Sequence, residues 1–346
     1  MSTAYRITRD ASLRARNTFG VDARAGKLIE VDDADALAEI LASESDEACP
    51  LVLGGGSNLL FAGNPDGPVL ALGSRAFRVI ADDGDHVVIR ADAGVQWHAF
   101  VMATLEQGYR GLENLALIPG TVGAAPIQNI GAYGVEVETL IHAVEAFEHD
   151  GRRHVRLDRE ACDFAYRDSR FKREPDRHIV TAVEFVLSRS GMPQLEYAGI
   201  RDELAAMHID NEPDALQVAE AVIRLRRRKL PDPAVIGNAG SFFKNPIVPL
   251  ARAEALQAQY EALPMFRVDG AATRKLSAAW LIDACGWKGH RDGDAGVSER
   301  HALVLVNHGS ASGMQLLDLA RRIADSVRER FGVALEPEPR LIGAEW

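Results

Sequence analysis

The sequence predicts an α+β protein, because strand-like and helix-like patterns fall in different parts of the 346-residue chain. In the first half, two clusters of turn residues, Asp82-Asp83-Gly84-Asp85 and Asp150-Gly151, each separate two β-rich runs, which predicts two hairpins. The last third instead repeats apolar residues at helical spacing. A chain of this length can build two or three domains and a large core.

Before residue 230, strands and helices are both expected. A helix is predicted over 33–43, where Leu37, Ile40 and Leu41 recur on one face. The apolar run 51–53 predicts a buried strand that ends at a cluster of glycines. The other expected elements are strands at 69–72, 77–81, 86–91, 141–149, 152–157 and 179–187, and helices at 96–107 and 214–229.

Beyond residue 230, helices dominate the prediction. The expected elements are helices at 250–263, 276–285 and 312–331, a strand at 302–306 and an extended segment at 333–342. Ser312 and Gln315 fit a capping box at the start of the last helix, and Gly332 fits its end.

Composition and charge exclude several classes of function. The net charge of −11 argues against nucleic-acid binding, which needs a basic face. The three cysteines form no CxxC and the ten histidines form no HExxH, so neither a disulfide framework nor a metal site is expected. The chain shows no signal-peptide core and no membrane-length apolar run, which favours a cytoplasmic protein without membrane association.

The glycine-rich end of the 51–53 strand is a candidate anion site. Backbone N–H groups in such a turn form a concave site for phosphate, and Ser57 and Asn58 can add donors to Gly54-Gly55-Gly56. The run is not a complete GxGxxG, since Leu59 stands at the last glycine position, and no lysine makes it a Walker A loop. An ordinary β-turn built from small residues is the alternative.

A second segment rich in small residues spans 119–134, inside a long stretch, 111–134, with little periodicity. A loop of that length in a compact domain is usually functional or disordered, and its apolar content makes disorder the weaker option. Such a strip lets an extended ligand lie against backbone, although a packing crossover explains it equally well. Two separated strips of this kind suggest a long ligand with a pyrophosphate at its middle.

A third segment, Gly237-Asn238-Ala239-Gly240-Ser241-Phe242-Phe243-Lys244-Asn245-Pro246, places a serine beside a glycine on a tight turn. Phe242 and Phe243 can pack beneath it and exclude water. A serine held in this way can give a proton to a reacting carbon. The alternative is a turn hydroxyl that bonds to backbone.

Five motifs together resemble the UDP-N-acetylenolpyruvoylglucosamine reductase family. In chain order they are GGGSN, PGTVGAAPIQNIGAYG, AYRDS, GNAGSFFKNP and LEPEPR. The resemblance runs from Asn17 to Gly343. It implies a two-part FAD-binding scaffold of the vanillyl-alcohol-oxidase-like type, followed by a substrate-binding α+β domain. Non-covalent FAD and the reductant NADPH are the implied cofactors, and an enolpyruvyl UDP-sugar is the implied substrate.

The resemblance assigns three catalytic residues. Arg167 matches the family's arginine that faces the charge developing on the substrate, a role for which an always-protonated guanidinium is suited. Ser241 matches the proton donor, and Glu338 matches the carboxylate near the reacting carbon. Surface ion pairing with Asp168 or Glu174 is the alternative for Arg167, and an exposed acidic tail is the alternative for Glu338.

The resemblance also assigns binding residues. The cofactor-binding set is Gly54, Gly55, Gly56, Ser57, Asn58, Gly120, Thr121, Gly123, Ala124, Gly131 and Arg167. Tyr197 resembles the tyrosine on a substrate-covering loop in the longer form of the family, and Lys229 and Asn245 match positions that hold the UDP diphosphate. His301 departs from the family pattern, which often has a polar amide there.

The implied domain division is 1–75 with 335–346 returning to it, 76–229, and 230–334. A monomer is expected. Two other readings stay open at this point: a different FAD-dependent oxidoreductase on the same scaffold, and a non-catalytic nucleotide-binding protein. Residues 119–134 contain no histidine or cysteine for a covalent flavin, which disfavours an oxidase of that type.

Overall fold

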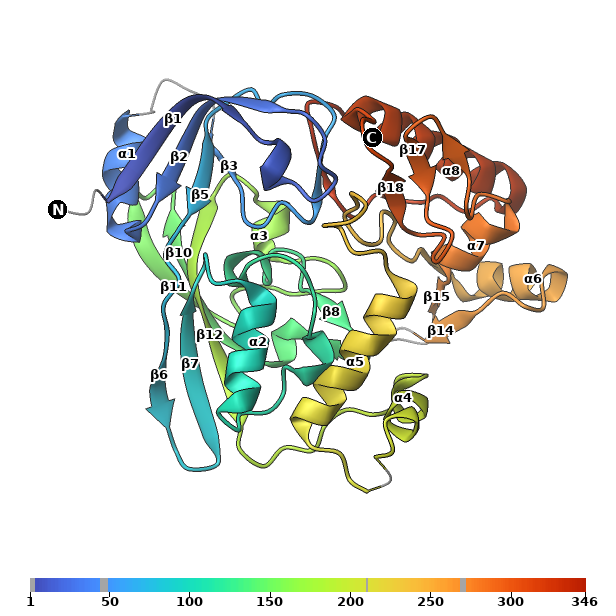
Figure 1. Ribbon diagram of the computed structural model, residues 1–346, viewed down its shortest axis with the longest axis horizontal. Coiled ribbons are helices and arrows are strands. Elements are labelled where there is room, and N and C mark those ends of the chain that lie inside the picture. Colours follow the sequence, from blue (N-terminus) through green and yellow to red (C-terminus); the bar gives the residue numbers. More distant parts are fainter. Residues whose placement is uncertain (1–3, 44–48, 210, 268–271) are drawn as a thin grey trace. The chain divides into compact units, whose positions relative to one another are not determined.

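The computed structural model describes residues 4–43, 49–209, 211–267 and 272–346 (Figure 1). The chain forms two compact units, and both are assembled from segments that are discontinuous in sequence. The first unit is Met1–Ala11, Ala25–Gly56 and Asp66–Arg227, and the second is Ser12–Arg24, Ser57–Pro65 and Arg228–Trp346.

The first sheet of the first unit has the strand order β1-β2-β5-β3. Its strands are β1 (Tyr5–Ser12), β2 (Arg24–Val31), β3 (Leu51–Val52) and β5 (Val69–Leu72). β5 pairs in parallel with both β2 and β3. Helix α1 (Leu37–Ser43), which follows the 3₁₀ turn η2 (Ala34–Ala36), buries its apolar stripe in a core shared with β2 and β5.

The second sheet is antiparallel, in the order β11-β10-β12-β7-β6. Its strands are β6 (Phe77–Asp82), β7 (His86–Asp92), β10 (Ile141–Glu148), β11 (Arg153–Asp158) and β12 (His178–Ser188). Helices α2 (Trp97–Glu106) and α5 (Ala215–Lys229) lie beside it and contribute to the same core (Figure 1). Trp97, Phe100 and Phe185 meet edge-on or tilted in that core, which fixes α2 against β12.

Short elements connect α2 to β10 across the small-residue segment. They are η3 (Glu113–Leu115), η4 (Val122–Ala124), β8 (Gly131–Ala132), β9 (Val135–Glu136) and η5 (Val137–Thr139). The first unit also contains α3 (Arg170–Arg173) and α4 (Ile200–Ala206). The segment is ordered but almost without regular structure, as its glycines and prolines predict.

The second unit contains small sheets and three helices. Its strands form the orders β13-β15-β14, β16-β17-β18 and β19-β4, the last pair parallel. The strands are β4 (Leu59–Phe61), β13 (Ile247–Pro249), β14 (Met265–Arg267), β15 (Thr273–Leu276), β16 (Arg291–Asp292), β17 (Ala295–Val297), β18 (Leu305–Asn307) and β19 (Arg340–Ile342). The helices are α6 (Leu250–Gln259), α7 (Ala278–Ala284) and α8 (Gly313–Phe331), and η1 (Arg14–Arg16) precedes them in the chain.

Most expected elements are present, and the exceptions have local causes. The capping box of Ser312 and Gln315 is confirmed at the start of α8. α6 ends at Gln259 rather than residue 263, because Tyr260 leaves helical geometry and its ring packs on Trp280 and Phe331. The strand expected at 302–306 begins only at Leu305.

The cause of that late start is a turn. The N–H of Val304 donates to the carbonyl of His301 at 3.0 Å, so the chain reverses before β18 begins. Strands β1 and β2 were not among the expected elements.

Candidate active site

The two glycine-rich segments of the first unit touch through their backbones. A Cβ added to Gly55 would lie 2.8 Å from the Cα of Gly120, and one added to Gly54 would lie 2.8 Å from Oγ1 of Thr121. Any side chain at Gly55 would therefore collide with backbone that cannot move aside. The sequence predicted that both segments serve one ligand, and they form one continuous strip.

This strip fits a cofactor with an anionic, extended middle. Gly54 is exposed, and Gly55, Gly120, Gly123 and Ala124 are half-buried, so backbone borders the solvent with little side-chain cover. Gly123 also has a packing role, since a Cβ there would lie 2.5 Å from that of Ala93. These features are what close approach of a dinucleotide to backbone requires.

Ser57 and Asn58 follow the strip but belong to the second unit. The carbonyl of Asn58 accepts a 3.0 Å hydrogen bond from the N–H of Arg340, at the start of the parallel pair β4 and β19. Its side-chain Nδ2 donates to the carbonyl of Glu338 at 3.4 Å. Asn58 therefore supports the backbone that carries Glu338, a role that the sequence did not indicate.

Arg167 lies on a strained turn beside Gly131 in the first unit. Its φ is 55°, in the left-handed region, and its Nη2 donates to the carbonyl of Gly131 at 2.7 Å. Lys172 Nζ donates to the Arg167 carbonyl at 3.0 Å, and the guanidinium lies 5.3 Å from the centre of the Tyr166 ring. Non-glycine residues in this backbone region cluster at functional sites.

The surface ion pairs considered for Arg167 are formed by other arginines. Asp168 pairs with Arg173, and Glu174 pairs with Arg177 at 2.8 Å.

Ser241 lies on a tight turn in the second unit, as its sequence predicts. Gly240 before it has a φ of 68°, and the Gly240 N–H donates to Asn238 Oδ1 at 3.0 Å. Phe242 and Phe243 are 0% and 1% exposed and pack edge to face at 5.1 Å. The expectation that these two rings lie beneath the serine and exclude water agrees with this burial.

Glu338 is brought next to the Ser241 segment by backbone pairing. The N–H of Glu338 donates to the carbonyl of Phe242 at 2.8 Å, and Phe243 forms a bridge with Pro337. Glu336 is exposed and accepts a 3.2 Å bond from Lys244 Nζ, whereas Glu338 is half-buried. The second unit thus holds the predicted proton donor and the predicted carboxylate on adjacent segments, and Arg167 belongs to the first unit.

His301 lies on the segment that pairs with Ser241 on its other side. Ser241 forms a bridge with Val304, and the Phe242 N–H donates to the Leu303 carbonyl at 2.7 Å. Nδ1 of His301 accepts from the Leu303 N–H at 3.3 Å, which leaves the ring proton on Nε2 of the neutral imidazole. Burial lowers the pKa of His301, and the charges of Lys229 and Lys288 lower it further.

Lys229 and Asn245 have different surroundings. Lys229 is exposed and contributes, with Lys288, positive charge around His301, which is the field that a diphosphate needs. Oδ1 of Asn245 accepts a 2.9 Å bond from the N–H of Ala278, the first residue of α7, whose N-cap is Ser277. Asn245 therefore has a structural task beside any ligand contact.

Tyr197 lies in the first unit, on a loop that leads into α4. It is 43% exposed, and its ring centre is 4.9 Å from that of Tyr133 at an angle of 67°. Sequence reasoning did not single out Tyr133. The available signal was a large aromatic between Ala132 and Gly134, inside a segment otherwise made of small residues.

Sequence analysis also did not single out Arg226, which lies in the basic run 224–229 at the end of α5. Its Nε donates to the Leu117 carbonyl at 3.2 Å. Burial lowers the pKa of Arg226, and the nearby Tyr133 phenol partly offsets that effect. Arg224, two residues earlier in the same helix, instead forms an ion pair with Glu220 at 2.8 Å.

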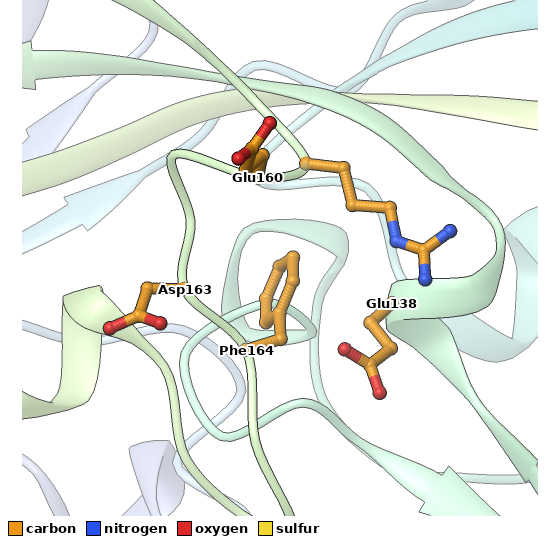
Figure 2. A pocket seen from close by; sticks show the side chains of 5 residues that line it. Glu138, Glu160, Asp163 and Phe164 are labelled. Carbon is orange, nitrogen blue, oxygen red and sulfur yellow. The ribbon is translucent and has the colours of Figure 1, made fainter.

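A pocket of about 440 Å³ in the first unit does not suit these ligands. Glu138, Glu160 and Asp163 surround the ring of Phe164, with Arg159 the one cation in its lining (Figure 2). Three carboxylates repel phosphate groups more than one guanidinium attracts them. The described residues contain no group of three or more side chains arranged to hold a metal ion. Within the same residues, no helix has both the length and the apolar character to cross a membrane.

Comparisons with known proteins cover the whole chain. Residues 26–156 match the family model "FAD binding domain", and residues 232–342 match "UDP-N-acetylenolpyruvoylglucosamine reductase, C-terminal domain". The UDP-N-acetylenolpyruvoylglucosamine reductase of Xanthomonas euvesicatoria pv. vesicatoria is 56% identical, over 99% of this chain and 98% of that protein. The enzyme of the same name from Xanthomonas oryzae pv. oryzae (strain PXO99A) is 57% identical over the same shares.

A solved structure agrees with these matches. The crystal structure of UDP-N-acetylenolpyruvylglucosamine reductase from Thermus caldophilus superposes with a TM-score of 0.69 at 27% identity, over 98% of this chain and 99% of that one. Relatives above 50% identity along nearly their full length leave no room for a different family. The chain belongs to the UDP-N-acetylenolpyruvoylglucosamine reductase family.

Proposed function

We infer that this protein is an FAD-dependent oxidoreductase that uses NADPH to reduce UDP-N-acetylglucosamine enolpyruvate to UDP-N-acetylmuramate, a step of peptidoglycan precursor synthesis. The observation that carries the inference is the 56% identity to a reductase of that name over 99% of the chain. The match of residues 26–156 to an FAD-binding domain indicates that the cofactor is FAD.

Bound FAD supplies the transfer of hydride from NADPH to the terminal carbon of the enolpyruvyl double bond. We propose that the backbone of 54–56 and 120–124 holds its pyrophosphate, with Ser57, Asn58 and Gly131 in the same binding set. The close approach of Gly55 to Gly120 supports this assignment, because it keeps side chains out of the strip. The N–H groups of Val122, Gly123 and Ala124 already donate to backbone carbonyls, so the donors proposed for the pyrophosphate are the other N–H groups of the strip.

Arg167, Ser241 and Glu338 are the proposed catalytic residues. Once hydride has added, negative charge grows on the neighbouring carbon and its carboxylate. The Arg167 guanidinium stabilises that charge, and the Ser241 hydroxyl gives its proton to the carbon. Glu338 assists either in its protonated form or by orienting a neighbour, since a bare carboxylate would oppose the developing charge.

Substrate binding is assigned to Tyr197, Lys229 and Asn245. The positive charge of Lys229 and Lys288, which lowers the pKa of His301, supports a diphosphate subsite in the second unit. Asn245 keeps both protons of Nδ2 for a ligand, while its Oδ1 already accepts the N–H of Ala278. We expect NADPH and the UDP-sugar to occupy one cleft in turn, since the sequence has no second nucleotide motif.

The remaining assignments are proposals of the same kind. The domain division stays a prediction: one FAD-binding subdomain at 1–75 with 335–346, a second at 76–229, and a substrate-binding domain at 230–334. A monomeric state and a cytoplasmic location are also proposed. Roles in cell shape and cell division follow from the proposed step in peptidoglycan synthesis.

One spectroscopic experiment tests the activity. The purified protein should be yellow, lose its flavin absorbance when NADPH is added without oxygen, and regain it when the enolpyruvyl UDP-sugar is added. Reoxidation by oxygen but not by that substrate would indicate a different FAD-dependent oxidoreductase. A colourless protein that binds no added FAD would contradict the enzyme assignment itself.

A further inference from the structure

We propose that Asn114 is a positioning residue that fastens the loop carrying Tyr197 to the hairpin carrying Tyr133, and thereby orients both rings for the UDP-sugar. The proposal rests on the proposed substrate role of Tyr197. It concerns a residue that touches neither cofactor nor substrate and acts through the two tyrosines.

The side-chain amide of Asn114 joins three remote parts of the first unit. It lies in η3, is 1% exposed, and donates through Nδ2 to the carbonyl of Tyr133 at 2.8 Å and to that of Gln194 at 2.9 Å. An amide nitrogen has two protons, and both are used. The two acceptors lie 19 and 80 residues away in sequence.

The orientation of this amide is set by its surroundings. Exchanging its oxygen and nitrogen would turn Oδ1 toward two carbonyl oxygens, so the donor assignment is secure. Oδ1 is buried and has no partner among the described residues. An unpaired buried carbonyl is unfavourable, so the two donated bonds are what this side chain contributes.

Tyr133 occupies a backbone position that most residues avoid. Tyr133 and Gly134 form the two-residue turn between β8 and β9, with φ values of 50° and 85°. Such a turn needs positive φ at both positions, for which asparagine or glycine is usual and tyrosine is not. A tyrosine kept there despite the strain points to a use for its ring, and the bond from Asn114 holds its carbonyl in place.

Tyr197 is held from both sides of its loop. On one side Asn114 binds Gln194, three residues before it. On the other side the Ile200 N–H donates to the Tyr197 carbonyl at 3.2 Å, where α4 begins. With both ends fixed, the exposed ring of Tyr197 stacks edge to face on that of Tyr133, so the amide sets the relative position of the two rings.

The test compares binding of UDP to the FAD-loaded enzyme, followed by flavin fluorescence. Asn114→Leu removes both donors at similar size and should weaken UDP binding about five- to thirty-fold, the range for a loss of one or two hydrogen bonds. It should raise KM for the UDP-sugar while kcat at saturation stays within about twofold. Asn114→Ala, which also lacks both donors and introduces no buried charge, replaces it if the leucine variant does not fold.

Asn17 offers a matched control. Its Nδ2 also donates to two buried carbonyls, those of Leu13 at 2.8 Å and Val21 at 3.0 Å, but in the second unit. Asn17→Leu should lower the melting temperature without weakening UDP binding. Equal weakening by both variants would reduce the Asn114 effect to general destabilisation and overturn the proposal.

The variant Tyr197→Ala distinguishes the substrate role of Tyr197 from the positioning role of Asn114. If Asn114 acts through Tyr197, the double variant should bind UDP about as weakly as Tyr197→Ala alone, because coupled residues are not additive. Weak binding in Tyr197→Ala with normal binding in Asn114→Leu would overturn the positioning role alone. Normal binding in Tyr197→Ala would remove the substrate role of Tyr197, and the Asn114 proposal with it.

Discussion

At the scale of single residues, the proposed role of Ser241 as a proton donor depends on its surroundings. Ser241 follows Gly240, whose φ is positive, and the two residues after it, Phe242 and Phe243, are buried. A hydroxyl is a poor proton donor in water, so the proposed role requires that water be kept from Ser241. Backbone pairing between Glu338 and Phe242 places the proposed carboxylate on the adjacent segment.

Replacing Ser241 by alanine should separate the two halves of the reaction. Flavin reduction by NADPH should keep its rate, because no proton from Ser241 enters that step. Reoxidation by the enolpyruvyl substrate should slow by roughly two to four orders of magnitude. Stopped-flow absorbance of the two half-reactions measures both, and equal slowing of the two halves would contradict the role.

His301 predicts a dependence of stability on pH. Its folded-state pKa lies below the ordinary value of 6.5, because burial and then Lys229 and Lys288 oppose the charged form. The unfolded chain therefore binds the proton more readily, and the stabilisation from neutral His301 is lost as pH falls below about 6.5 through the folded pKa. Urea unfolding of wild type and His301→Gln at pH 7.5 and pH 5 should show wild type losing more stability on acidification. Parallel losses in both proteins would show that other groups dominate.

Sequence reasoning proposes residues whose expected role depends on chemical type, and it does not reach residues whose proposed role depends on three-dimensional position. Ser241, Arg167 and Glu338 occur in motifs, so they could be proposed from the chain alone. The proposed roles of Asn114 and Tyr133 depend on a hydrogen bond to a backbone carbonyl and on a positive φ. Neither feature is visible before the β8–β9 hairpin and the 192–197 loop are placed.

At the scale of elements, the contact between the glycine-rich turn after β3 and the turn before η4 should be intolerant of any side chain. Gly55→Ala would place a Cβ 2.8 Å from the Cα of Gly120 and push the two backbones apart. We expect the purified variant to retain much less FAD, measured as the ratio of flavin to protein absorbance and as the dissociation constant for added FAD.

Gly26→Ala is the control for this change. A Cβ at Gly26 would meet no atom within 4 Å, and its φ is ordinary, so FAD content should match the wild type. Full FAD occupancy in Gly55→Ala would show that the close backbone contact is not part of the cofactor site.

Elements with strong periodicity or clear boundaries were predictable, and elements defined by partners were not. α8 had a capping box and a terminal glycine, and both hairpins had turn residues between β-rich runs. By contrast, β19 is a three-residue strand that exists because it pairs with β4, some 280 residues earlier in the chain. Short strands of this kind depend on tertiary contacts that local sequence does not encode.

At the scale of the whole molecule, the second unit depends on residues from the beginning of the chain. The ring of Phe19 lies 6.4 Å from that of Phe242, the Asn238 N–H donates to the Thr18 carbonyl at 2.9 Å, and Asn307 Nδ2 donates to the Phe19 carbonyl at 3.0 Å. The carboxyl-terminal third, which the sequence presents as a continuous helical region, thus completes its core with segments 12–24 and 57–65.

An isolated fragment 228–346 should therefore fail to fold. It lacks β4, the partner of β19, and it lacks Phe19. Phe242 would therefore lose a buried ring contact, and polar groups around Asn307 would be left without hydrogen-bond partners. Circular dichroism and amide NMR should show no cooperative melting and poor dispersion for the fragment, whereas the full chain melts cooperatively. Addition of a peptide covering residues 12–24 should not restore the fold without β4. A fragment that melts cooperatively and gives dispersed amide signals would contradict the prediction, because it would show that residues 228–346 fold without segments 12–24 and 57–65.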